Sequence, residues 1–479
     1  MRTANVKLFA RQVYTGVFTN KAVAALLIII ALLIAYALYS GLLLYRQQTK
    51  SIQTYQQQVR AHWEAMPDKH PHRMAHYGYI AFRHRHLLSF FDRGMESYTG
   101  NAVFLEAHRQ NSVNLSEAGL SSGILRFGEI HSAMILQILL PLALFFTGFG
   151  TVASDRENGT LKILLSQGAT WKEIIAGKAL GLLGIALTLL LPAIATMVIA
   201  CLALEQPAFV ADDLLRIGWL GIAYTLYFGI IALVAVIVSA VSRSAKLALV
   251  SLMGIWLLLA VVLPRTAQAT GQHLFETPSK IAFNRAVEKE LLATGDSHNP
   301  DDPYYKALKD SVLKARNADS IQQLPFNYSG FQMREGERLS AEMYNRHLFK
   351  LWGIYEKQNA VSEYSAFINP FVAIRNFSMA ISGTGFHDYI RFQQQAEAYR
   401  YRLAQHMNEL QMQYISNQAQ DKPQAISQAF WKQFPDFTYE RFNTPAVVTG
   451  QGLPVIVMLW WIAGLLLLVQ LLSNKLKAI

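Results

Sequence analysis

The sequence is poor in charged residues and contains a single cysteine. Charged side chains make up 16% of its 479 residues, against about 25% in average soluble proteins. The shortage is concentrated in long apolar stretches without Asp, Glu, Lys or Arg, which favours burial in a membrane. The only thiol, Cys201, lies inside one of these stretches, so no disulfide within the chain can stabilise the polar segments.

Six apolar stretches predict six membrane-spanning helices. A span takes about 20 mostly apolar residues in helical form, because hydrocarbon offers no partner to an unpaired backbone N–H or C=O. We expect the fifth span to be short and to end at Pro264. The first is longer than the apolar region of a signal peptide, which predicts an uncleaved anchor. The predicted spans have their cores near residues 22–45, 130–153, 179–204, 217–242, 247–264 and 446–472.

Two long polar segments separate these spans and predict an outer domain with its own core. The predicted fold class is an all-α membrane protein, with six transmembrane helices and a mostly helical extracytoplasmic domain formed by two insertions. The segment 367–386 is too interrupted to span, and we expect it to pack in the outer domain or on the outer leaflet. The predicted order is a cytoplasmic amphipathic helix (1–21), transmembrane helix 1 (22–45), a first extracytoplasmic insertion (46–129), transmembrane helices 2–5 (130–264) with the loop 154–178, a second extracytoplasmic insertion (265–445), and transmembrane helix 6 with a cytoplasmic tail (446–479).

Lysine and arginine gather on one side of the predicted spans. They occupy the N-terminal arm, the segment 154–178 and the turn at Arg243 and Lys246, whereas the turn between the third and fourth spans holds Glu205 and Asp212. The positive-inside rule then predicts that both termini lie in the cytoplasm. The net charge of +11 follows from this topology, so we expect a lipid bilayer and no nucleic acid as partner.

Motifs for catalysis are missing from the sequence. Gly177-Lys178 has no glycine five residues before Gly177 and no hydroxyl after Lys178, so it is not a phosphate-binding loop. If ATP drives this chain, another chain binds the ATP and magnesium. No arrangement of Ser, Cys or carboxylates indicates an enzyme or a bound cofactor. The predicted spans also lack the charged residues of a proton relay.

Histidines cluster in the first polar segment, where eight of the thirteen lie between residues 62 and 131. His72 and His76 are four apart, a spacing that puts both on one face of a helix, and His84 and His86 alternate as on a strand. Imidazoles at such spacings can bind a metal. Neighbouring arginines repel a cation, however, and no glutamate completes a zinc-hydrolase motif. The sequence therefore favours structural, hydrogen-bonded histidines over a metal site.

The segment 154–178 combines charge, a glycine and a short amphipathic helix between the second and third spans. Leu161 and Leu164 form an apolar helical face, Gly159 permits a turn, and Thr160 opens the helix. A simple connector would explain this pattern. The alternative is a coupling helix that docks in a cleft of a soluble ATPase, with Arg156 and Glu157 as the leading docking residues. The candidate coupling residues are Asp155, Arg156, Glu157, Gly159, Thr160, Leu161 and Leu164.

Two stretches of this segment resemble the signature of six-span, type 2 ABC exporter permeases. They read Asp155-Arg156-Glu157-x-Gly159-Thr160-Leu161-x-x-Leu164-Leu165-Ser166 and Gly177-Lys178-x-Leu180-Gly181. The chain departs from the pattern where Asp155 replaces a glutamate and where no proline follows Ser166. The resemblance implies a permease that pairs with an ABC ATPase subunit and with a second permease, either itself or a paralogue.

The polar segments resemble a narrower branch of bacterial permeases with an uncharacterised extracytoplasmic domain. The matching motifs include Pro71-His72-x-x-Ala75-His76-Tyr77-Gly78, Leu105-Glu106-Ala107-His108 and Asn369-Pro370-Phe371-x-Ala373-Ile374-Arg375. Export of a substrate is the leading hypothesis. A mechanotransmitter that moves an extracytoplasmic partner without solute flux is the second. A membrane scaffold or receptor without any ATPase is the third.

Overall fold

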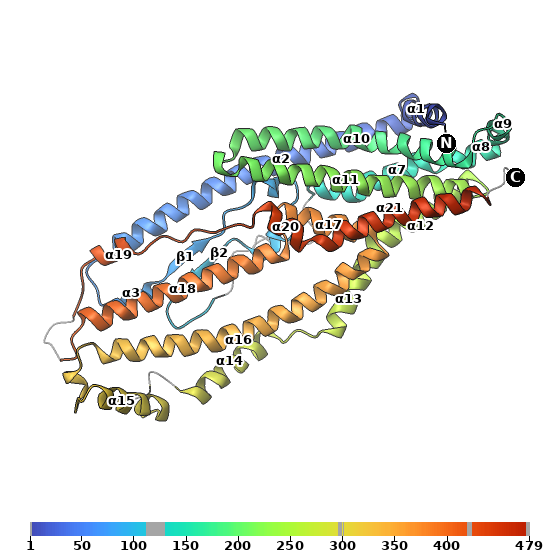
Figure 1. The fold of residues 1–479 in the computed structure, drawn as a ribbon. Helices are drawn as coiled ribbons and strands as arrows, with labels where there is room; N and C mark the ends of the chain where they lie inside the picture. The colour runs from blue at the N-terminus through green and yellow to red at the C-terminus, as the bar shows by residue number, and fades with distance from the viewer. Residues whose placement is uncertain (1, 112–129, 296–298, 300, 419–423, 476–479) are drawn as a thin grey trace.

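The computed structural model describes residues 2–111, 130–295, 299, 301–418 and 424–475, and it is built mainly of helices (Figure 1). The end of the first predicted insertion, 112–129, and the last four residues of the predicted tail lie outside the described residues. Six helical runs among the described residues are long and apolar enough to cross a membrane, as the sequence predicts. They are Lys21–Glu64, Ser132–Glu157, Trp171–Leu204, Pro207–Val241, Ala245–Leu274 and Gly452–Ser473.

These six runs pack into one bundle with a shared apolar core. The second run consists of several consecutive short helical elements, and one π-helical turn interrupts the fifth. In a bilayer, van der Waals packing of these faces and hydrogen bonds between helices hold such a bundle together. The elements are α2 (Lys21–Glu64), α6 (Ser132–Met134), η3 (Ile135–Leu139), α7 (Leu140–Gly148), α8 (Gly150–Glu157), α10 (Trp171–Leu204), α11 (Pro207–Val241), α12 (Ala245–Leu257), η4 (Leu258–Val262), α13 (Leu263–Leu274), α20 (Thr444–Gly450) and α21 (Gly452–Ser473).

Pro264 does not end the fifth run, contrary to the prediction. It occupies the first turn of α13, where a missing N–H is tolerated, and the π-helical turn η4 precedes it. The second run has the same arrangement, because the π-helical turn η3 lies just before Pro141. Each π turn exposes carbonyls that other elements satisfy: Ile138 accepts from Trp256 Nε1 at 3.0 Å and Leu259 accepts from Asn369 Nδ2 at 2.8 Å.

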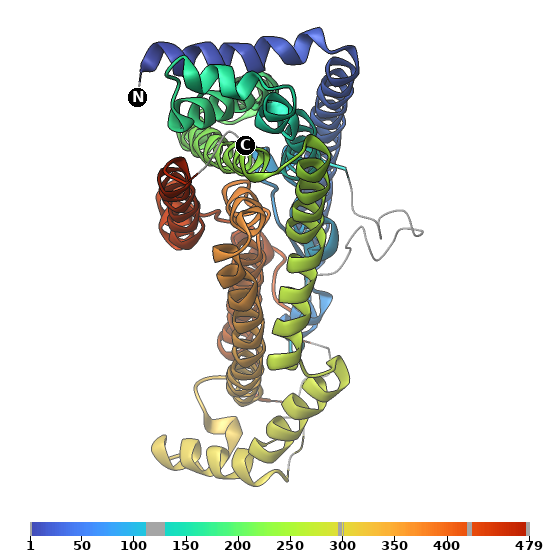
Figure 2. The same cartoon turned by 90° about the vertical axis from the view of Figure 1, so that its right-hand side faces the viewer.

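The N-terminal helix α1 (Thr3–Thr19) lies across one end of the bundle, against α10 (Figure 2). Glycines on α10 make the close approach possible. A Cβ on Gly177 would meet Phe9 Cβ at 2.6 Å, and one on Gly181 would meet the Ala10 carbonyl at 2.7 Å. Such small-residue spacing is a known helix-packing motif in membranes. The predicted amphipathic helix is thus present, and its buried face, which includes Val6, rests on protein.

We call residues 46–111 and 275–443, apart from α17, the distal domain. Its two segments share a second core, in which Trp63 donates to the Trp431 carbonyl at 3.0 Å. The first segment begins as a continuation of the first candidate span, since α2 runs without a break to Glu64. The elements are α3 (Pro71–Tyr77), β1 (Tyr79–Phe82), η1 (Leu87–Phe90), α4 (Glu96–Thr99), β2 (Ala102–Leu105), α14 (Lys280–Thr294), α15 (Pro303–Ala315), η5 (Ile321–Gln323), α16 (Tyr328–Tyr364), η6 (Ser365–Phe367), α18 (Phe386–Tyr414) and α19 (Ala429–Gln433).

The two strands form an antiparallel hairpin in which Tyr79 pairs with Leu105 and Phe82 with Ala102. This hairpin is the only sheet among the described residues, so the helical prediction holds for the rest of the distal domain. Figure 1 places α15 and α19 at the end of the molecule opposite to α1, α9 and both labelled termini.

Helix α17 (Pro370–Ile381) packs among the candidate spans, and not in the distal domain as expected. Its residues Val372 and Phe377 are fully buried in the bundle core, against α11 and α21. The preceding turn η6 carries the Ala366 carbonyl, which accepts from Trp461 Nε1 at 3.2 Å. Trp461 lies in the middle of α21. The α16–η6–α17 hairpin therefore reaches the level of the middle of a candidate span and turns back.

Candidate functional site

The segment between the second and third runs folds as a helix, a turn and a second short helix. Helix α8 ends at Glu157, Gly159 takes a left-handed φ of 79°, and α9 (Thr160–Ser166) follows. Glycine adopts this conformation without the Cβ penalty of other residues. Leu161 is fully buried, and Leu164 packs on the same core. The predicted turn and apolar face are both present.

The two leading docking residues, Arg156 and Glu157, contact the turn between the fourth and fifth runs. Arg156 donates to the carbonyls of Ser242 and Ala240, which end α11. Glu157 accepts at 3.2 Å from the N–H of Ala245, the first residue of α12. A cation at a helix C-terminus and an anion at an N-terminus both complement the helix dipole. Glu157 thus supplies an acceptor to the first N–H of α12, next to the N-cap residue Ser244.

Asp155 is bound on the opposite side of α8. It forms an ion pair with Lys178, whose ammonium also donates to the Thr151 carbonyl. The Lys178 side chain is 2% exposed and the Asp155 side chain 19% exposed. The three charged residues therefore tie the end of the second run to the third, fourth and fifth runs. A push on α9 would move these helices together.

The surface of α9 that faces away from the bundle carries a residue that the sequence analysis missed. Ile163 is 56% exposed, next to exposed Lys162 and Thr160. An apolar side chain exposed in this way is available for contact with a partner. Ile163 is apolar but lies off the helical face that Leu161 and Leu164 form, and this was the signal present in the sequence.

The start of α1 joins the same region. The Asn5 amide donates to Glu173 Oε2 at 2.9 Å, and the Arg2 backbone N–H donates to Glu173 Oε1 at 2.5 Å. Arg2 also donates to the Gly168 carbonyl, just after α9. Glu173 forms a capping box with Thr170 at the start of α10. Helices α1, α9 and α10 therefore form one cluster at this end of the molecule.

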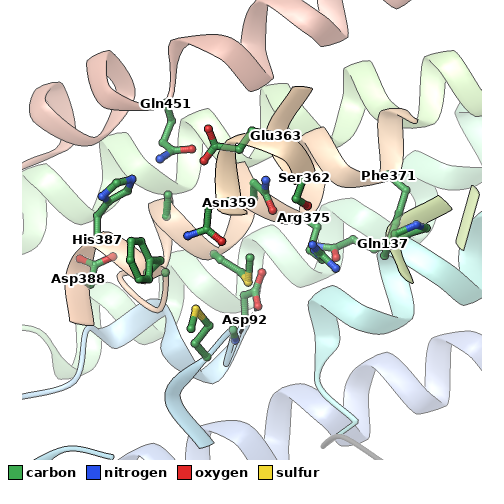
Figure 3. A pocket seen from close by; sticks show the side chains of 18 of the residues that line it. Asp92, Gln137, Asn359, Ser362, Glu363, Phe371, Arg375, His387, Asp388 and Gln451 are labelled. Atoms are coloured by element: carbon green, nitrogen blue, oxygen red, sulfur yellow. Dashed lines mark hydrogen bonds between the residues drawn. The ribbon is translucent and has the colours of Figure 1, made fainter. Parts of the chain in front are cut away.

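A second candidate site is a cavity of about 1050 Å³ between the bundle and the distal domain. Both π-helical turns contribute to its wall, through Gln137 and Ala260. The α16–η6–α17 hairpin, called the re-entrant hairpin below, contributes Glu363 and Arg375 (Figure 3). π turns occur often at functional sites. Amide, acidic and basic side chains alternate with apolar ones around the cavity, which suits a ligand with both polar and apolar groups.

A hydrogen-bonded chain joins the cavity to the second and fourth runs. Gln137 donates to Tyr224 Oη at 2.7 Å, Tyr224 lies 3.1 Å from Ser378 Oγ, and Ser378 donates to Asp92 Oδ2 at 2.5 Å. Asp92 and Ser378 are buried. Buried polar networks of this kind fix geometry because each member needs its partner. Sequence reasoning missed this site because four separate segments supply it.

Asp388 gives the cavity a titratable group at the start of α18. Burial raises the pKa of this carboxyl to about 6, and Arg83 and Arg216 oppose the rise only in part. The carboxyl thus changes charge near neutral pH. Figure 3 shows it beside His387 on the cavity wall.

The four histidines predicted as metal candidates are not brought together. His84 lies 2.9 Å from Gln56 Oε1, and His86 lies buried, 3.1 Å from Asp213. His84 and His86 both follow β1 and do not lie on a strand, so the prediction that they alternate as on a strand is wrong. Burial lowers the pKa of His86 well below its usual value. His72 and His76 do lie together, on α3, as their spacing predicted.

Comparison with known proteins covers only a portion of the chain. Residues 280–440 match a family described as a domain of unknown function, DUF3526. This region runs from α14 to the segment after α19 and includes most of the second segment of the distal domain. A search of curated proteins gives no match.

Proposed function

We propose that this chain is the transmembrane permease subunit of an ATP-binding-cassette exporter in a bacterial inner membrane. In this proposal both termini and α9 lie in the cytoplasm, and the distal domain lies on the far side. A separate ABC ATPase binds ATP and magnesium. A second permease, identical or paralogous, completes the pathway.

The observation that carries the proposal is the construction of the α8–α9 segment. It presents Ile163 outward on a short helix, while Asp155, Arg156 and Glu157 tie its base to three other runs. A passive connector has no need of such ties. An arrangement that moves several spans in response to force on one short helix suits coupling to a nucleotide-driven motor.

The cavity supports transport over the mechanical alternative. The sequence has few polar residues in the predicted spans, which favours a transmitter without solute flux. The re-entrant hairpin, however, supplies charged and amide groups at the level of the spans, including Arg375 and Asn359. A cavity of this size with both polar and apolar lining suits a transported compound better than a purely mechanical role. The distal domain nevertheless remains a candidate surface for an extracytoplasmic partner.

The coupling role is tested by the ATPase activity of the purified complex. Ile163→Asp and Arg156→Ala should each abolish stimulation of the partner ATPase by this chain. Phe349→Asp is the matched control, because Phe349 is 55% exposed but lies on α16 in the distal domain. Unchanged stimulation in both α9-region variants would sink the coupling role.

Inside-out vesicles distinguish transport from mechanical transmission. With ATP, mass spectrometry of vesicle contents should find a compound that accumulates with the wild type. Ala260→Trp narrows the cavity and should prevent accumulation, whereas Leu258→Trp, on a 45% exposed position of the same π turn, should not. ATP-dependent changes in protease protection of the distal domain, with no accumulated compound, would favour the transmitter.

A further inference from the structure

Three histidines converge at one corner of the distal domain. His72 and His76 lie one turn apart on α3, and His108 follows β2. One nitrogen from each ring lies within 4.8 Å of the others. The Nε2 atoms of His72 and His76 are 3.2 Å apart, and the ring centre of His108 lies 5.5 and 5.2 Å from their ring centres.

The backbone holds these rings in place before any ligand binds. Helix α3 starts with His70 as its cap and Pro71 in its first turn, and it buries Met74 against the distal core. The Ala107 N–H donates to the Ala75 carbonyl at 3.3 Å, which fixes the end of β2 to α3. His108 then adopts a φ of 60°. This conformation is uncommon for a residue other than glycine and is worth a functional explanation.

A buried carboxylate orients the third histidine. Glu337 Oε2 lies 3.2 Å from His108 Nδ1 and accepts the His108 backbone N–H at 3.0 Å. With Nδ1 committed to Glu337, Nε2 is the atom of His108 that a metal would take. Carboxylates that hold the second nitrogen of a ligand histidine are a recurrent feature of zinc sites.

Two of the arginines near this corner, Arg400 and Arg109, pair with carboxylates. Arg400 lies 2.5 Å from the second oxygen of Glu337 and also pairs with Glu397 at 2.7 Å. Arg109 lies 3.9 Å from Glu106. The repulsion that the sequence suggested is therefore reduced by neighbouring carboxylates.

We propose that His72, His76 and His108 bind one zinc ion, with Glu337 as the positioning residue for His108. Two Zn–N bonds of about 2.0–2.1 Å at a tetrahedral angle separate their nitrogens by about 3.3 Å, close to the 3.2 Å between His72 and His76. The fourth position is open to water or to a ligand. This proposal does not depend on the transporter role.

The bound ion has a structural consequence. It joins α3 to the segment after β2, and through Glu337 it joins both to α16. Zinc would therefore cross-link two parts of the first segment, and the Glu337 contact would connect the loaded site to the second segment. An ion that binds only the folded domain raises its stability by RT ln(1 + [Zn]/Kd), with [Zn] the free zinc concentration.

The test is zinc binding by the full-length protein without a histidine tag, stripped with a chelator and titrated against a competing zinc dye. The wild type should bind one equivalent, with X-ray absorption showing nitrogen or oxygen ligands near about 2.0–2.1 Å. His76→Gln should weaken binding by at least about tenfold, and Glu337→Gln by about 10- to 100-fold. His62→Gln is the matched control, since His62 is also exposed but lies on α2.

Two results would overturn the proposal. One is wild-type protein that takes up no stoichiometric zinc. The other is His76→Gln protein that binds as tightly as the control. His76 is exposed, so this variant keeps its fold, which circular dichroism verifies. Copper bound by all three histidines in a tetragonal site, with no zinc uptake, would also overturn the choice of zinc.

Discussion

Removing the carboxylate of Asp155 should destabilise the bundle much more than removing the charge of its partner. In Asp155→Asn, the ammonium of Lys178 stays buried at 2% exposure with only the Thr151 carbonyl and a neutral amide nearby. Breaking a buried ion pair in this way costs about 3–5 kcal/mol, or roughly 150- to 5,000-fold in the unfolding equilibrium. In Lys178→Met the remaining Asp155 is 19% exposed and can reach water, so the cost should be smaller.

The assay is a double-mutant cycle on the protein in detergent or lipid, measured by reversible unfolding. The variant Asp155→Asn/Lys178→Met should regain most of the stability lost in Asp155→Asn, because no buried charge remains. The order of stabilities should be wild type, then the double variant and Lys178→Met, then Asp155→Asn. Equal losses for both single variants, or a double variant that is the least stable, would refute the buried-pair reasoning.

Three further predictions concern helix packing, titration and membrane depth. Gly177→Ala should cost about 1–3 kcal/mol of stability and loosen α1 in protease-protection assays, because its Cβ would lie 2.6 Å from α1. Gly254→Ala is the control, because its Cβ meets no atom within 4 Å, and it should be neutral or stabilising. The pKa of Asp388 rises from 3.8 unfolded to about 6 folded, so stability should fall by about 2 kcal/mol as pH rises from about 4 to 6, and Asp388→Asn should remove this slope in pH-dependent unfolding. Ile368 is 60% exposed at the hairpin turn and Ile281 is 66% exposed on α14. In sealed membranes, Ile368→Cys should resist an impermeant maleimide, whereas Ile281→Cys should react. Equal labelling of the two cysteines would contradict the re-entrant hairpin.

Local patterns in the sequence predict much of the fold. The apolar runs give six candidate spans. The leucines of α9 and the glycine before it predict a turn followed by an amphipathic helix, and Leu161 is indeed buried. The two segments of the distal domain share a core, as expected because both begin on the same side of the predicted spans.

Features that depend on distant partners are not visible in the sequence. Pro264 predicts a helix end, but η4 accommodates it, and the carbonyl exposed there is satisfied by Asn369, 110 positions away. Arg156 and Glu157 suggest docking residues because they are charged and near a turn, whereas their partners lie on another turn. His108 lies 32 positions after His76, so no helical or strand period connects them. The sequence around α17 is too interrupted by Pro370, Arg375 and two glycines to be recognised as a segment that packs among the candidate spans.

A photo-crosslinker in place of Ile163 tests whether α9 contacts an ATPase, as we propose. After irradiation of native cells, mass spectrometry of the adduct should identify a soluble ATPase subunit with a phosphate-binding loop. The same crosslinker at Leu467, 60% exposed on α21, should give no such adduct. Adducts at Ile163 limited to lipid, or to proteins without a nucleotide site, would contradict the account.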